Sequence, residues 1–188
     1  MGPDFAANVT SAIRSMEQTV IPAVDPKNSA AQEQAYLVLY HLRLFSDQHK
    51  HLLSFRLQEI RDFHALTSVL VERAHAKGVE LGEAGDAAAL ALSAGAPYLE
   101  LRIPRYDDLA AAAQGLREAA DRLVVNLRDR GGSDLLKSVG ADELLLAVSA
   151  RDEARARAWV KALGMDPSPG DIPALADLMK SVESPGNE

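Results

Sequence analysis

Cysteine is absent from the 188 residues of this chain. Its absence excludes disulfides, thiolate zinc sites, iron–sulfur clusters and cysteine nucleophiles together, and it fits a reducing compartment. Aromatic residues are also scarce, at 5% of the chain. A β-sheet is usually richer in Tyr, Phe, Val and Ile, whereas alanine-rich helices pack closely through small side chains, so the composition favours helices.

Targeting and membrane signals are missing as well. No apolar run reaches the ~18 residues of a membrane span, and the N-terminus lacks the basic-then-apolar order of a secretory signal. Ala6 stands where a myristoylation signal would need Ser or Thr. The net charge of −7 disfavours binding to nucleic acid or to anionic membranes. We therefore expect a cytoplasmic protein that binds neither.

The N-terminal half shows long helical periodicity. A first helix is predicted over about residues 5–21, where apolar residues recur every three or four positions. Neither glycine nor proline occurs between Pro26 and Gly78, yet one helix there would be roughly 70 Å long, too long for a compact domain of this size. We predict two helices, the first opened by a Ser29–Gln32 capping box, with a break at Ser46–Asp47. The apolar stripe of this stretch is Val38, Leu42, Phe45, His49 and Leu52.

The segment after Gly78 has weaker signals. Asp86 is predicted to cap a short helix that ends near residue 94, because Gly, Ala and Pro follow at positions 95–97. Tyr98–Ile103 alternates apolar and polar residues with the period of a β-strand. This pattern predicts either an extended connector or a strand that pairs with its copy across a dimer axis.

The C-terminal half is predicted to hold one long helix and several short ones. The long helix runs from Tyr106 to Arg130 and ends at Gly131–Gly132. The short helices are expected at about 134–139, 142–148, 150–163 (capped by Ser149) and 173–182. Arg151, Arg155, Arg157 and Lys161 are expected on a solvated helix face, with Trp159 in the core.

Together these patterns predict an all-α protein. Its architecture is expected to be an up-and-down helical bundle of long amphipathic helices, with shorter C-terminal helices packed on it. We treat residues 1–183 as a single helical domain, with the long-helix bundle at about 5–130 and the small helices at about 133–182. Residues 184–188 are expected to form a disordered tail.

All five histidines lie between positions 41 and 75, which raises the question of a metal or ligand site. No two of them are three or four residues apart, the spacing that would place two ligands on one helix face. Carboxylate–histidine pairs do have that spacing: Asp47 with His51, and Glu72 with His75. Di-iron bundles use Glu-x-x-His twice, and this chain has it once. We expect no metal and no cofactor, and a structural role for His49 on the apolar stripe with a hydrogen-bond partner.

A second candidate site is the pair Arg102 and Arg105, which precedes a helix and resembles an anion site. The adjacent Asp107 and Asp108 are more simply the cap and first-turn charges of that helix. No Gly-rich phosphate loop and no Gly-x-Ser-x-Gly elbow is present.

No assembled catalytic motif stands out, so an enzyme is disfavoured without being excluded. The leading hypothesis is a helical protein that acts by association, either as a homo-oligomer, with a dimer favoured, or with a partner protein. The alternative is a bundle that binds a small ligand or metal through the histidine-rich helices, and an enzyme of unrecognised type comes third.

Overall fold

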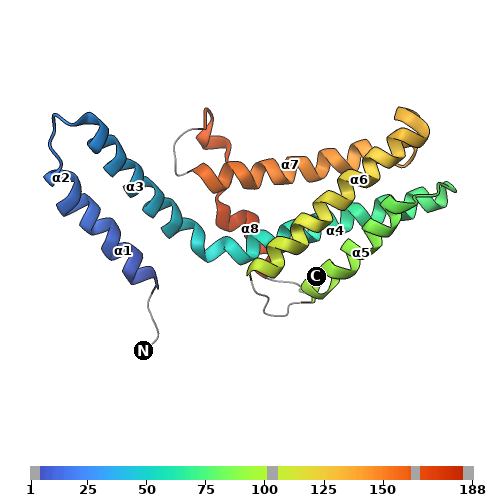
Figure 1. Cartoon of the computed structure of the whole chain (residues 1–188), viewed down its shortest axis with the longest axis horizontal. Helices are drawn as coiled ribbons and strands as arrows, with labels where there is room; N and C mark the ends of the chain where they lie inside the picture. Colours follow the sequence, from blue (N-terminus) through green and yellow to red (C-terminus); the bar gives the residue numbers. More distant parts are fainter. Residues whose placement is uncertain (1–4, 101–105, 162–165, 184–188) are drawn as a thin grey trace. The chain divides into compact units, whose positions relative to one another are not determined.

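The computed structural model describes residues 5–100, 106–161 and 166–183, and these form helices and their connections, without a strand (Figure 1). The all-α prediction is confirmed. The contacts divide the chain into two units. Unit 1 comprises residues 1–51 and 156–173, and unit 2 comprises residues 52–155 and 174–188. Among the described residues, no helix combines the length and the apolar character needed to cross a membrane.

Unit 1 is built on a hairpin of two helical segments that pack against each other (Figure 1). The first segment confirms the predicted N-terminal helix and extends it to Ala23. Within it, residues Met16–Val20 form a π-helical turn, in which the hydrogen bonds span five residues and not four. The helical elements of the hairpin are α1 (Phe5–Ser15), η1 (Met16–Val20), α2 (Ile21–Ala23) and α3 (Ser29–Gln48).

The start of α3 differs by one residue from the prediction. Asn28 is the N-cap, and its side-chain oxygen accepts a hydrogen bond from the Ala31 amide at 3.1 Å. The predicted capping box of Ser29 with Gln32 is wrong, because Gln32 instead donates to the Val24 carbonyl at 3.0 Å. Asparagine is among the strongest N-caps, so the helix is capped by Asn28, one position before the predicted cap Ser29.

The predicted break in the glycine-free stretch is confirmed, two residues later than expected. Ser46 and Asp47 remain helical, α3 ends at Gln48, and a 3₁₀ turn, η2 (His49–His51), leads to α4 (Leu52–Ala76). At the far end of α4, Gly78 has φ +68° and the Val79 amide donates to the Ala74 carbonyl at 3.0 Å. This left-handed glycine ends the helix as the sequence predicted.

A bidentate ion pair ties the C-terminal segment of unit 1. Arg157 donates to both carboxylate oxygens of Asp166, at 2.8 and 2.9 Å, and the Ser168 amide donates to the same carboxylate. These bonds stabilise the charged form, Arg157 contributing most, and lower the pKa of Asp166 from 3.8 to about 2. The stabilisation is therefore present above the ordinary carboxyl pKa and is lost as the pH falls through about 2.

We expect an NMR titration to find the Asp166 carboxyl pKa at about 2, and Arg157→Gln to move it back toward 3.8. An Asp166 pKa that Arg157→Gln leaves unchanged would contradict the assigned cause.

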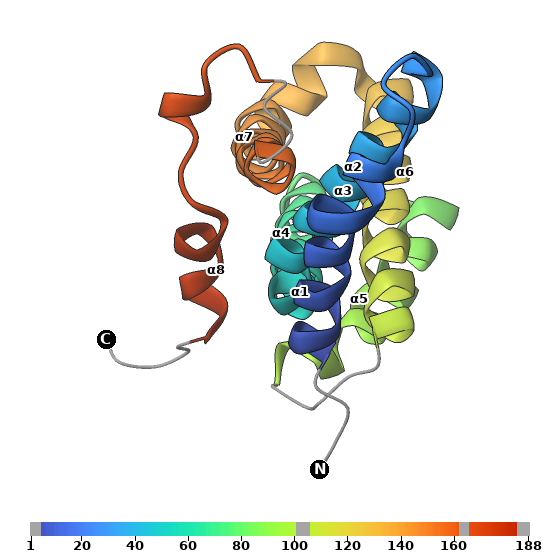
Figure 2. The same ribbon diagram turned by 90° about the vertical axis from the view of Figure 1, so that its left-hand side faces the viewer.

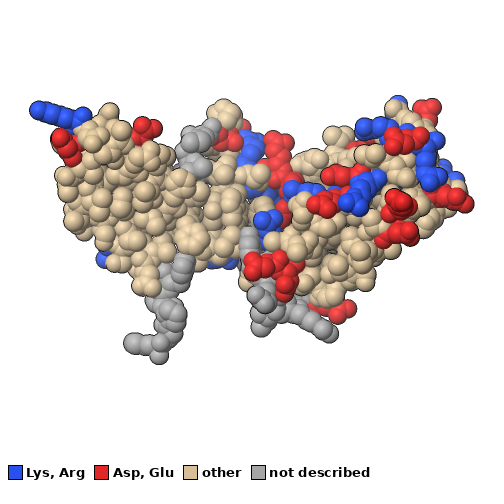
Figure 3. All heavy atoms as spheres, in the orientation of Figure 1, with Lys and Arg blue, Asp and Glu red and all other residues tan. Residues whose placement is uncertain are grey.

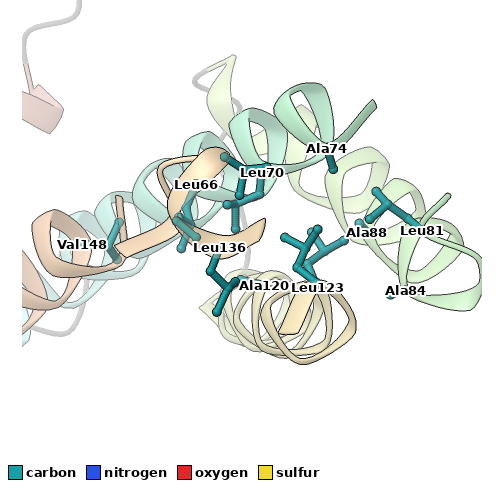
Figure 4. Packing of buried hydrophobic residues seen from close by; sticks show 13 residues of the cluster. Leu66, Leu70, Ala74, Leu81, Ala84, Ala88, Ala120, Leu123, Leu136 and Val148 are labelled. Atoms are coloured by element: carbon teal, nitrogen blue, oxygen red, sulfur yellow. The ribbon is translucent and has the colours of Figure 1, made fainter. Parts of the chain in front are cut away.

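Unit 2 is a packed set of helices in which α4, α5 and α6 lie side by side (Figures 1 and 2). Its main core fills the space between them with leucine and alanine (Figure 4). Leu70, Leu123 and Leu127 are fully buried. The elements after α4 are α5 (Glu83–Leu99), α6 (Tyr106–Ser138), α7 (Ala141–Val160), η4 (Pro169–Asp171, in unit 1) and α8 (Leu175–Glu183), which packs on α4.

The prediction around residues 86–103 is wrong in two respects. Helix α5 begins at Glu83, ahead of the expected cap, and continues through Pro97 to Leu99, so the start of the alternating segment is helical. Gly95 does not end the helix. It is buried, and a Cβ there would lie 2.9 Å from the Leu116 Cδ1, so the glycine permits close packing on α6. Residues 101–103 lie outside the described part of the chain.

The glycine pair after residue 130 marks a real break. Helical structure continues to Ser138, but Gly132 has φ 62° and ψ −156°, which kinks the chain there. The predicted break at Ser149 is wrong, because α7 is continuous and the exposed Ser149 caps nothing. The last helix begins at Leu175, two residues after the predicted start at Pro173.

Two glycines of unit 2 provide opposite predictions. Gly115 lies within α6, where a Cβ would have no neighbour within 4 Å, so Gly115→Ala is expected to raise the free energy of unfolding by about 0.5–1 kcal/mol.

Gly140 has φ +65°, and a Cβ would lie too close to an Arg73 guanidinium nitrogen that donates to the Val139 carbonyl. Gly140→Ala is expected to cost about 1–2 kcal/mol. Urea unfolding of both variants measures this, and equal effects of the same sign would contradict the assignment.

Candidate functional site

Between Ala35 and Phe45, helix α3 carries apolar side chains on nearly every side. Its 20 residues include only three charged ones, Glu33, Arg43 and Asp47. A helix that is apolar all round is normally buried on all sides in a folded protein. The composition of α3 therefore predicts that several neighbouring surfaces cover it.

Within unit 1, only part of α3 is covered. Ala35 and Leu39 are buried, as is Val9 of α1, the helix that packs against α3. The predicted stripe was partly wrong here, because Val38 and Phe45 are exposed and Leu42 is half-buried. The contact with α1 thus selects a different side of α3 from the one the coiled-coil spacing indicated.

The remaining side of α3 presents a group of large apolar side chains to solvent, which we call the α3 surface. Its exposed members are Tyr36 (48%), Leu37 (41%), Val38 (48%), Tyr40 (46%) and Phe45 (44%), and the half-buried Leu44 lies among them. Single exposed apolar residues are ordinary, but this many within ten positions of one helix form a patch. Figure 3 shows that charged side chains are sparse over the visible face of α1 and α3.

Contacts at the edge and end of the α3 surface hold α3 in place within unit 1. Arg43 pairs with Glu17 at 2.5 Å, which holds its guanidinium toward the first helical segment. Gln48 is 8% exposed, and its side-chain amide donates to the Trp159 carbonyl at 2.6 Å. These two contacts connect α3 to both other segments of unit 1.

The histidine candidates do not assemble into a metal centre in the part of the chain that the structure describes. His49 has the expected hydrogen-bond partner, since its Nδ1 lies 2.8 Å from the Ser46 carbonyl oxygen. Asp47 is exposed and His51 is half-buried. Among the described residues, no group of three or more His, Asp or Glu side chains is placed to hold a metal ion.

The other candidates lie at the surface or outside the described residues. Glu72 and His75 are both exposed near the end of α4. Arg102 and Arg105 fall in residues 101–105, outside the described ranges, so the anion-site hypothesis stays a prediction.

Unit 2 contains a charged cluster that sequence reasoning missed. Asp62 of α4 accepts from Arg151 at 2.9 Å and from Arg155 at 2.5 Å. Arg155 is only 3% exposed, so its predicted place on a solvated face is wrong. The spacing of Arg151 and Arg155, four positions apart on one face of α7, was the available signal. Their partner lies about ninety positions away in the sequence, where no pattern indicated it.

A second carboxylate extends this cluster to α6. Glu59, 3% exposed, accepts from Arg56 at 2.5 Å and from Arg117 at 2.6 Å. Asp152 lies 3.5 Å from Arg117 and 3.3 Å from Arg155, which joins the two halves. The charges are thus paired across α4, α6 and α7, as expected for buried ionised groups.

A hollow of about 280 Å³ adjoins the cluster on α4, α7 and α8. Two arginines line it, a feature that would suit an anionic ligand. Both arginines already bind Asp62, so an anion would have to compete with a buried carboxylate. The arrangement is that of a structural network. The lining residues are Gln58, Ala150, Arg151, Ala154, Arg155 and Leu178.

No protein-family model, curated protein or solved structure matches this chain. The α3 surface and the charged cluster are the two features that bear on function. The carboxylates of the cluster are paired with arginines, whereas the large apolar side chains of the α3 surface are exposed.

Proposed function

We propose that this protein acts by association, and that the α3 surface is where it binds another protein chain. The observation that carries the proposal is the exposure of five large apolar side chains within one helix. Exposed apolar area is unfavourable in water by roughly 25 cal/mol per Å², and covering it drives association. An apolar centre with tyrosine and phenylalanine is also the usual composition of a protein–protein interface core.

The polar atoms of the α3 surface fit the same role. Tyr36 and Tyr40 combine a large apolar ring with a hydroxyl that can bond across an interface, which suits a surface exposed in one state and covered in another. Glu33 and Asp47 lie before and after residues 36–45 in the sequence, and Arg43, within that stretch, is paired with Glu17. A partner would therefore not have to desolvate an unpaired charge at the centre of the contact.

Site-specific photocrosslinking in cells tests the proposal. A photoreactive phenylalanine analogue at Tyr40 is expected to give a covalent adduct of defined mass after irradiation. The matched control is the same analogue at Leu146, a leucine of α7 that is 72% exposed and lies outside the α3 surface. Absence of a protein adduct at Tyr40, or equal adducts at both positions, would contradict the proposal.

A further inference from the structure

We infer that a groove between α5 and α6 binds a cationic amphipathic helix of another protein. We call it the α5–α6 groove. All of it lies in unit 2, so it is a second binding surface, separate from the α3 surface of unit 1. The inference therefore goes beyond the proposed function and does not depend on it.

Three adjoining hollows make up the α5–α6 groove. Their volumes are about 380, 280 and 280 Å³. The first and second share Arg122, and the second and third share Gly115 and two alanines. On α6 the lining residues follow the spacing of one helix side from Asp108 to Asp129, a length of about 30 Å. The groove is therefore long enough for a helix of about 20 residues.

Small residues line the middle of the groove, with Ala91, Ala94 and Gly115 shared by two hollows. A Cβ at Gly115 would have no neighbour within 4 Å, so packing within the described residues does not require glycine there. Gly95 differs, because a Cβ at that position would collide with Leu116. Glycine inside a helix lowers stability, but it lets another backbone approach closely. The open space at Gly115 thus fits contact with a molecule outside the chain.

The charged side chains of the groove are mainly acidic. Arg122 is the only basic side chain among the described residues that line the three hollows. A second guanidinium, that of Arg130, bonds Asn126 of the first hollow at 3.0 Å. Against these two stand five carboxylates, which form no ion pair within the described part of the chain. They are Glu83, Asp108, Glu118, Asp121 and Asp129. This excess selects a partner that carries lysine or arginine.

Exposed apolar side chains in the groove indicate the other face of the partner. Leu90 is 74% exposed and Val125 is 52% exposed, and both line the hollows. Large aliphatic side chains of a partner would cover them and remove apolar area from water. A helix lying between two neighbouring helices buries its apolar face and keeps its charges at the edges. The partner is therefore an amphipathic helix with an aliphatic face and cationic flanks.

The same charge disfavours other occupants. Two copies of this chain, each with a net charge of −7, would oppose carboxylates if their grooves met. The arginines of α7 in a second copy are not available as a cationic face, because Arg151 and Arg155 are bonded to Asp62. Phosphates of nucleic acids and of anionic lipids would be repelled by the groove.

A synthetic peptide with this chemistry tests the inference on the full chain. The probe is a helix of about 20 residues with leucine on one face, lysine on the other and a nitroxide at its centre. In amide NMR spectra it is expected to broaden the signals of the groove, including those of Ala94 and Gly115. A second peptide with glutamate in place of lysine keeps the apolar face and is expected to bind at least tenfold more weakly.

Gly115→Leu separates binding from folding. Its side chain would occupy the open space in the groove, so the dissociation constant of the lysine peptide is expected to rise tenfold or more. The helix itself should be retained, because leucine is a better helix former than glycine. Ala147→Leu is the matched control, since it adds leucine at an exposed position of α7 outside the groove and should leave the constant unchanged.

A charge reversal tests the acidic rim. Asp121→Lys with Asp129→Lys is expected to raise the dissociation constant of the lysine peptide tenfold or more. The control, Glu72→Lys with Glu153→Lys, changes the net charge equally at exposed positions outside the groove and should have a smaller effect.

Loss of binding in the groove variants alone supports the inference. Three results would each overturn it: no broadening in the groove, equal affinity for the two peptides, or equal losses in the groove variants and their controls. These results leave the proposed function untouched, because the Tyr40 photocrosslink tests a different surface.

Discussion

Replacing Asp62 with alanine is expected to lower the free energy of unfolding by about 3–5 kcal/mol, because it leaves a buried arginine without its main carboxylate partner. Arg155 is 3% exposed and its Nη1 lies 2.5 Å from the Asp62 Oδ2. The remaining contact of Arg155 with Asp152, at 3.3 Å, is longer, and the Asp152 side chain is 33% exposed. Urea unfolding followed by circular dichroism measures the change as a shift of the midpoint at constant slope.

Two controls separate loss of pairing from loss of volume. The double variant Asp62→Leu with Arg155→Met removes both charges and should recover most of the lost stability, since well-packed apolar replacements of a buried pair are often neutral. Glu118→Ala removes an exposed carboxylate of α6 that accepts a hydrogen bond from Gln114, and should change stability by less than about 0.5 kcal/mol. A loss in the free energy of unfolding below about 1 kcal/mol for Asp62→Ala would contradict the prediction, because it would mean that the Arg155 guanidinium is solvated without its partner.

Replacing Leu123 with alanine is expected to lower the free energy of unfolding by about 2–5 kcal/mol. Leu123 is fully buried in the core between α4, α5 and α6, where Figure 4 shows it beside Ala88 and Ala120. The loss combines the transfer free energy of the removed methyl groups with the cavity they leave, because small alanine neighbours cannot move in to fill it. The same urea experiment measures it.

Leu90→Ala provides the matched control for this substitution. Leu90 is 74% exposed on α5, so its removal leaves no cavity, and alanine is an equally good helix former. The stability should change by less than about 0.5 kcal/mol. Equal losses at positions 90 and 123 would contradict the burial assigned to the core.

The charged cluster illustrates what pattern reasoning misses. The spacing of Arg151 and Arg155 predicts a shared face of α7, but it does not predict that this face is buried. Burial of Arg155 depends on Asp62, which is 93 positions away. No local period connects two such positions, because their pairing arises only when α7 packs against α4.

The α3 surface shows a different kind of error. The sequence contains the necessary signal, since apolar residues surround α3 on nearly every side between Ala35 and Phe45. Coiled-coil spacing selected Val38 and Phe45 as buried, whereas contact with α1 buries Ala35 and Leu39. When a helix is apolar all round, periodicity cannot choose which side faces its neighbour.

The sequence by itself determined the helical class and most of the places where helices stop. The break before residue 52 and the left-handed glycines Gly78 and Gly132 depend on backbone preferences within a few residues, so local patterns predict them. Only the tertiary structure decided that Arg155 is buried, that Pro97 lies within a helix and that one side of α3 remains open. These features depend on packing between segments distant in sequence, where the free energy of burial outweighs local preference.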